Sequence, residues 1–92
     1  MANLSFSQSF ILSGSIKDYK NKEPLIGANI FLIGTSLGAA TSNDGSYKIS
    51  NINPGTYILK ATYIGYESKE IKIDVAFGEK LKHDFELHYK TI

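Results

Sequence analysis

Hydrophobic and polar residues alternate along most of this chain with a period of two, which is the pattern of β-strands. The clearest alternation lies in residues 70–75, where Ile71, Ile73 and Val75 fall on one face and the charged residues between them fall on the other. A strand with one buried face has this arrangement, because successive side chains point to opposite sides of the sheet. Residues 70–75 are therefore predicted to form a half-buried antiparallel strand.

Four further apolar stripes have the same period, and each predicts another strand. The stripes are Phe10, Leu12, Gly14 and Ile16; Ala28, Ile30 and Leu32; Tyr57, Leu59, Ala61 and Tyr63; and Leu81, His83, Phe85, Leu87 and Tyr89. Their inward parity assigns Tyr57 and Tyr63 to the core. Tyr47, which follows a turn signal, is expected to point inward as well.

Turn signals separate the predicted strands. Asn43-Asp44-Gly45-Ser46 predicts a hairpin, because Asp-Gly readily takes the positive φ angles of a tight turn. Asn53-Pro54-Gly55-Thr56 suits a type II turn, in which Pro sets the first angle and Gly takes the second. Phe77-Gly78-Glu79 is expected to break the last two strands.

Strands are therefore predicted near residues 10–18, 27–33, 38–42, 46–51, 56–65, 68–76 and 80–90. No stretch predicts a helix, because each long run is interrupted by Gly or Pro or is rich in β-branched and aromatic residues. Seven short strands with frequent turns indicate an all-β fold, a seven-stranded β-sandwich with Greek-key connections.

The length of 92 residues fits one domain, which we expect to span residues 10–90. Residues 1–9 are interpreted as disordered: Met1 and Ala2 as residues added for expression, and the stretch that follows as the remnant of a secretory signal peptide. Ser5 and Ser7 would be the small residues before the cleavage site. The alternative is a polar N-terminus with no role in export.

Composition narrows the range of functions. The net charge of +1 produces no long-range field of one sign, so nucleic acid and anionic membrane surfaces are not expected partners. There is no Cys, which excludes disulfides, thiolate catalysis and Cys-based zinc sites, and no Arg, the residue best suited to bidentate binding of phosphate. No apolar run approaches the ~20 residues of a membrane helix, so direct membrane insertion is not expected.

An ordered series of motifs resembles the carboxypeptidase-regulatory-like domain family, whose fold is transthyretin-like. The series is Gly14-Ser15-Ile16-Lys17-Asp18, Glu23-Pro24-Leu25-Ile26-Gly27-Ala28-Asn29-Ile30, Ile33-Gly34-Thr35, Gly38, Thr41, Asn43-Asp44-Gly45-Ser46-Tyr47, Pro54-Gly55-Thr56-Tyr57 and Tyr63-Ile64-Gly65-Tyr66-Glu67. It covers roughly residues 12 to 76. These positions shape turns and strands, and none is placed to carry out a reaction.

The resemblance implies a context more than an activity. Such domains occur at the N-terminus of SusC-like TonB-dependent outer-membrane transporters, beside the catalytic domain of metallocarboxypeptidases, and as modules of other exported proteins, some of them carbohydrate-binding. The Tyr63–Glu67 motif and the signal-like residues ahead of the first strand look most like the transporter context. The implied location is the periplasmic face of the outer membrane after cleavage of a signal peptide.

No combination of residues predicts catalysis, a metal site or a cofactor. His83 and His88 are five apart on one predicted strand and point to opposite faces, so they are not expected to share a metal. Asn43, Asp44 and Gly45 do not follow the spacing of an EF-hand, and a hairpin turn explains them better. Serines lack the Gly-x-Ser-x-Gly setting of an activated nucleophile. We therefore expect a protein that is not an enzyme.

Tyrosine is the residue type with a candidate binding role. Tyr19, Tyr66 and Tyr89 are the plausible surface aromatics, and their rings could stack on sugars, although packing at the rim of the core explains them more simply.

Two functions remain. The first is a non-catalytic periplasmic interaction domain of a TonB-dependent nutrient transporter. Its partners would be the plug and barrel of that transporter, or periplasmic energy-transducing and accessory proteins. The second is a carbohydrate-binding or adhesive module of another exported protein, for which the ligand would be a glycan.

Overall fold

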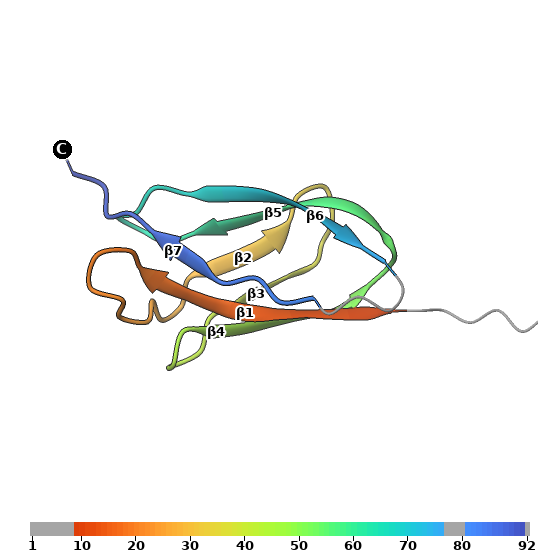
Figure 1. The fold of residues 1–92 in the computed structure, drawn as a ribbon, viewed down its shortest axis with the longest axis horizontal. Coiled ribbons are helices and arrows are strands. Elements are labelled where there is room, and N and C mark those ends of the chain that lie inside the picture. The colour runs from red at the N-terminus through yellow and green to blue at the C-terminus, as the bar shows by residue number, and fades with distance from the viewer. Residues whose placement is uncertain (1–8, 77–80, 92) are drawn as a thin grey trace, which may run out of the picture.

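A computed structural model of the chain describes residues 9–76 and 81–91, in which seven strands form two packed sheets (Figure 1). The strands are β1 (Phe10–Asp18), β2 (Asn29–Leu32), β3 (Gly38–Ala40), β4 (Ser46–Ile52), β5 (Gly55–Thr62), β6 (Lys69–Val75) and β7 (Phe85–Leu87). One sheet has the order β4-β1-β7 and the other β3-β2-β5-β6. The predicted all-β, transthyretin-like sandwich is confirmed.

The core lies between the two sheets, where the predicted apolar stripes meet. The side chains buried there include Leu12, Ile16, Ala28, Ile30, Leu32, Tyr47, Leu59, Ala61, Ile73, Val75, Phe85 and Leu87. Each strand contributes alternate residues to this layer, as the period of two requires. Tyr57 and Tyr63 are half-buried and pack against the edge of the core.

The last predicted strand, 80–90, is wrong in extent, since β7 covers only Phe85–Leu87. This segment changes its partner along its length. Before β7, His83 N–H donates to the carbonyl of Ser13 in β1, and β7 itself pairs with β1 in parallel. After β7, Lys90 N–H donates to the carbonyl of Gly65 beyond β5, so this part of the chain has crossed to the other sheet. One continuous strand cannot satisfy both sheets.

The Asp-Gly turn forms between β3 and β4, but the predicted hairpin is wrong, because β3 and β4 belong to different sheets and do not pair with each other. Gly45 has φ 79°, a conformation that side chains with a Cβ rarely adopt, and a Cβ there would lie 2.7 Å from Cβ of Pro24. The carboxylate of Asp44 accepts hydrogen bonds from the hydroxyls of Ser42 (2.7 Å) and Ser46 (2.6 Å). The turn is thus closed by both backbone geometry and side-chain hydrogen bonds.

The predicted signal remnant (residues 4–8) and the predicted break at Phe77-Gly78-Glu79 lie outside the described residues. In the part of the chain that the structure describes, no helix could serve as a membrane span.

Candidate functional site

Three segments meet at one end of the sandwich: the loop after β1, the turn after β5 and the residues after β7. Figure 1 shows this end at the left, where β7 runs toward the C-terminus. A bridge joins Tyr66 to Tyr89, and Tyr19 N–H donates to the carbonyl of Leu87. Backbone pairing therefore brings together three tyrosines that are far apart in the sequence: Tyr19, Tyr66 and Tyr89. We call these residues, with Asp18 and His88, the aromatic end.

A buried carboxylate anchors the aromatic end. Asp18 closes β1 on the inward side of the strand, with 7% of its surface exposed. Its Oδ1 accepts hydrogen bonds from the backbone N–H groups of Lys20 (2.7 Å) and Asn21 (3.1 Å), and its Oδ2 accepts the phenol of Tyr66 (2.6 Å). Each carboxylate oxygen thus has a donor, as a buried charge requires.

The same hydrogen bonds shift the two pKa values in opposite directions. The Tyr66 phenol, followed by the N–H of Asn21, lowers the pKa of Asp18. The hydrogen bond to Asp18, together with burial, raises the pKa of Tyr66 to about 12. The neutral phenol and the ionised carboxylate therefore stabilise each other across neutral pH.

Aromatic contacts build outward from this pair. The rings of Tyr66 and Tyr89 meet edge to face, with centroids 5.3 Å apart. Tyr19 stacks on His88 at 4.1 Å, and Nζ of Lys22 lies 4.7 Å from the centroid of the Tyr19 ring. A hollow of about 470 Å³ opens beside them, lined by Asp18, Tyr19, Lys20, Asn21, His88, Tyr89 and Thr91.

The three tyrosines predicted at the surface differ in exposure. Tyr19 is 49% exposed and Tyr89 is 64% exposed, whereas Tyr66 is half-buried and bound to Asp18. The neighbouring Ile64, in the turn after β5, is 92% exposed. The rings of Tyr19 and Tyr89 and the side chain of the neighbouring Ile64 are thus exposed to solvent, and the ring of Tyr66 packs against that of Tyr89.

The sequence reasoning missed Asp18 and the pairing of His88 with Tyr19. The parity of β1 contained the signal for Asp18, because it continues the inward series of Leu12 and Ile16. The pairing of His88 had no such signal, since it depends on where the chain after β7 runs.

His83 is half-buried and contributes backbone hydrogen bonds. Among residues 9–76 and 81–91, no three His, Asp or Glu side chains form a group suited to a metal ion.

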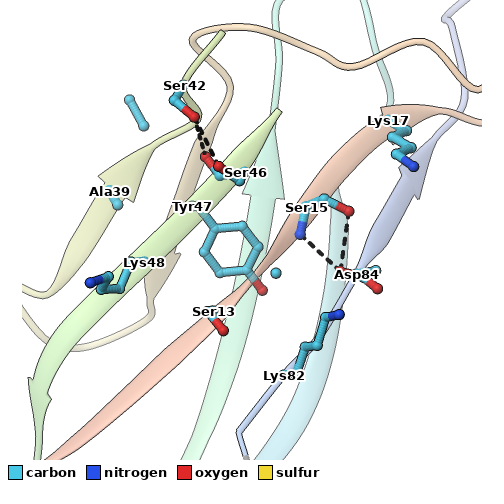
Figure 2. A pocket seen from close by; sticks show the side chains of 12 residues that line it. Ser13, Ser15, Lys17, Ala39, Ser42, Ser46, Tyr47, Lys48, Lys82 and Asp84 are labelled. Atoms are coloured by element: carbon cyan, nitrogen blue, oxygen red, sulfur yellow. Dashed lines mark hydrogen bonds between the residues drawn. The ribbon is translucent and has the colours of Figure 1, made fainter. Parts of the chain in front are cut away.

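A second hollow lies away from the aromatic end, beside β4 (Figure 2). Its volume is about 730 Å³, and we call it the polar groove. It is lined by Ser13, Gly14, Ser15, Lys17, Ala39, Ala40, Ser42, Ser46, Tyr47, Lys48, Lys82 and Asp84. Lysines and hydroxyls dominate this lining. It presents no exposed aromatic ring, because Tyr47 is buried.

Comparison with known proteins identifies the relatives of the chain. Residues 12–92 match the family model described as the CarboxypepD_reg-like domain. The chain is 34% identical over 83 residues to the TonB-dependent receptor SusC of Bacteroides thetaiotaomicron, and this match covers 90% of the chain and 8% of that receptor. It is also 40% identical over 50 residues to the TonB-dependent receptor P39 of Formosa agariphila, and this match covers 54% of the chain and 5% of that receptor. The chain thus spans less than a tenth of the length of either relative.

A solved structure shares the fold. The pilus 2b backbone protein of group B streptococcus superposes with a TM-score of 0.68 at 18% identity, over 88% of this chain and 41% of the pilus protein. This likeness concerns the β-sandwich alone.

Proposed function

The chain belongs to the carboxypeptidase-regulatory-like domain family, and from that premise we propose that it is a non-catalytic interaction domain of a TonB-dependent outer-membrane nutrient transporter. The observation that carries the proposal is the match of this region to two TonB-dependent receptors from different bacteria. The domain would occupy residues 10–90, near the N-terminus of the transporter and on the periplasmic face of the outer membrane. The residues ahead of it would be the remnant of a cleaved signal peptide.

The domain would act through protein contacts. Its partners would be the plug and barrel of the same transporter, or periplasmic energy-transducing and accessory proteins. The aromatic end supports this role, because the exposed rings of Tyr19 and Tyr89 pack against His88 and Tyr66, and the neighbouring Ile64 adds exposed apolar surface. Ordered aromatic side chains lose little entropy on binding and are enriched at interfaces.

Fractionation of the source cells tests the proposal. An antibody against this chain should detect a band many times larger than 10.2 kDa in the outer-membrane fraction. That band should shift on heating, as closed barrels do. A small soluble species would contradict the transporter assignment. In-frame deletion of residues 10–90 should then alter import or assembly, and import that continued unchanged would argue against a required role.

A carbohydrate-binding module is the second candidate, and one observation favours it. The exposed rings of Tyr19 and Tyr89 flank the hollow of about 470 Å³, and aromatic faces suit the C–H side of a sugar ring. The 92-residue chain would be titrated with a panel of glycans, and binding should weaken in the variants Tyr19→Ala and Tyr89→Ala. Tyr57→Phe, at the opposite end of β5, is the control. A flat titration across the panel would exclude this candidate.

A further inference from the structure

Cross-strand register builds the floor and walls of the polar groove. On the solvent face of the three-stranded sheet, Ser13 of β1 lies opposite Lys48 of β4 on one side and opposite Lys82 on the other. The next outward residue of β1, Ser15, lies opposite Ser46 of β4. Short side chains therefore occupy the middle of the central strand, Lys48 and Lys82 flank it, and Lys17 lies at one end of it, as Figure 2 shows. The surface is hollow because its middle strand carries small residues.

The groove has an excess of positive charge. Lys17, Lys48 and Lys82 are exposed, and none of them takes part in the ion pairs found among residues 9–76 and 81–91, which are Lys22–Glu86 and Lys60–Glu70.

The two nearby carboxylates are already engaged in hydrogen bonds. Oδ1 of Asp84 accepts the N–H (2.9 Å) and the hydroxyl (3.1 Å) of Ser15, and Asp44 accepts the hydroxyls of Ser42 and Ser46. Three ammonium groups thus face the groove without an ion-pair partner in the described chain.

One wall of the groove is a free strand edge. β4 pairs only with β1 within the described residues. Ile16 N–H donates to the carbonyl of Gly45, which makes these two residues a hydrogen-bonded pair. Such pairs alternate along an antiparallel ladder, so Tyr47 and Ile49 also form their backbone hydrogen bonds with β1. The N–H and C=O groups of Lys48, between them, then point away from β1. Across the opening lie Ala39 and Ala40 of β3, whose small side chains leave room.

From these features we infer that the polar groove binds an extended acidic peptide, which adds to the free edge of β4 as a further strand. An added strand would lie about 4.8 Å from β4 and would satisfy the outward N–H and C=O of Lys48. Acidic side chains on its solvent face would then stand opposite the ammonium of Lys48, with Lys82 farther across the same row. Both the backbone and the charge of the groove have a complement in such a partner.

Another ligand for the groove and another edge for the peptide both fit less well. A glycan would find no exposed ring to stack on, because Tyr47 is buried and its hydroxyl donates to the carbonyl of His83. The other long free edge, that of β6, carries the mixed charges Lys69, Glu70, Lys72 and Asp74. Mixed charges on an edge strand discourage pairing with a partner of one sign.

The inference rests on the proposed interaction role, and a titration of the 92-residue chain tests it independently of the cell fractionation. The probe is a synthetic extended peptide in which Glu and Thr alternate, and the control is the same peptide with Lys in place of Glu. Backbone amide NMR at low salt should show shifts confined to residues 46–50 and to Ser13 and Lys82. At about 0.5 M salt the binding should largely disappear, because screening acts over a few Å at that ionic strength.

Variants separate the charge of the groove from its backbone edge. Lys48→Ala should weaken binding of the acidic peptide about two- to fivefold, as expected for one exposed charge pair, and Lys72→Ala on β6 is the matched control. Lys48→Pro removes the outward N–H of the free edge as well as the charge and leaves the apolar face intact, so it should abolish the NMR shifts of β4 that Lys48→Ala only weakens. A thermal melt and the amide spectrum show whether this variant is folded. If it is not folded, the Lys48→Ala and Lys72→Ala pair decides the question.

Three results would overturn the inference. These are saturating addition of the acidic peptide without shifts at β4, equal binding of the Lys-containing peptide, and shifts that map to β6. Preferential binding of an acidic oligosaccharide to the same residues would replace the peptide with a glycan. In each case a large band in the outer membrane would leave the transporter assignment standing.

Discussion

The phenol of Tyr66 donates a 2.6 Å hydrogen bond to Oδ2 of Asp18, and this bond joins the two sheets at the aromatic end. Asp18 closes β1 of the three-stranded sheet, whereas Tyr66 follows β5 of the four-stranded sheet. The bond needs a neutral phenol and an ionised carboxylate at once. Its contribution to stability is therefore lost in acid, where Asp18 is protonated, and in alkali, where Tyr66 is ionised.

Removing the Tyr66 hydroxyl should lower stability only inside a defined pH window. The pKa of Asp18 is lowered in the fold, so its contribution is present above the ordinary value of 3.8 and is lost as the pH falls through the folded value. The pKa of Tyr66 is raised to about 12, so its contribution is present below 10.0 and is lost as the pH rises toward 12. Tyr66→Phe should thus melt at a lower temperature than the wild type between about pH 5 and pH 9, and the difference should shrink outside that range.

Tyr57→Phe is the control for this experiment. The Tyr57 phenol donates to a backbone carbonyl, that of Asn53, at 2.6 Å. Because no carboxylate is involved, the gap in melting temperature between this variant and the wild type should not close in acid. A gap for Tyr66→Phe that stayed constant down to the lowest pH measured would show that Asp18 is not the acceptor in solution.

The Asp44 carboxyl should titrate in strong acid. Hydrogen bonds from Ser46 first, and then from Ser42, lower the pKa of Asp44 to about 2. Carbon-detected NMR of the carboxyl should show this midpoint in the wild type, and Ser46→Ala should move it toward the ordinary value of 3.8. Ser50→Ala, at an exposed position of the same strand, should leave the midpoint in place. A wild-type midpoint near 3.8 would mean that the hydrogen bonds of the Ser42–Ser46 turn do not persist in solution.

Periodicity located most strands because burial of one face is a local property of a strand. The predicted ranges 10–18, 46–51 and 68–76 lie within one residue of β1, β4 and β6 at each end. The prediction for 80–90 was wrong because its period of two continues while its hydrogen-bond partner changes. The first part of this segment hydrogen-bonds to Ser13 and the last part to Gly65. The alternation of polar and apolar residues contains no information about which strand a segment pairs with.

The same reasoning explains what could be predicted of the aromatic end. Tyr19 and Tyr66 fall outside the inward stripes of the predicted strands, so the sequence assigns both to the surface. Their meeting with Tyr89 depends on the crossing of the chain after β7, which is a tertiary property. Tyr66 is half-buried because its hydroxyl donates a hydrogen bond to Asp18, an inward residue of β1.

Gly14→Ala should destabilise the fold strongly for its small change in volume. A Cβ at this position would lie 1.8 Å from the carbonyl oxygen of His83, so the backbone of one segment must move. Forced rearrangement of a packed site typically costs about 1–3 kcal/mol or more. Urea unfolding measures this cost, and Ser13→Ala, on the opposite face of the same strand, should stay within about 0.5 kcal/mol of wild type. Equal stability of the two variants would contradict the close approach.

Tyr47→Phe should loosen one segment of the chain more than it destabilises the whole. The Tyr47 hydroxyl spans from β4 to the carbonyl of His83, and the N–H of His83 in turn donates to Ser13 at 2.9 Å. Loss of one such hydrogen bond typically costs about 1 kcal/mol. Because the cost falls on the segment before β7, hydrogen exchange should quicken at the amides of Ser13 and His83.

The exchange pattern and its pH dependence distinguish this local effect from general loosening. The Ile33 amide, which donates to Ile58 in the other sheet, should change only by the loss in global stability. Burial, and after it the charge of Asp84, raises the pKa of Tyr47 above its ordinary 10.0. The contribution of the phenol is therefore complete below pH 10.0 and is lost as the pH rises above it. The exchange rates of Ser13 and His83 in the wild type should then approach those of Tyr47→Phe in alkali, whereas a uniform change at all three amides would place the effect in the core and not in the tether.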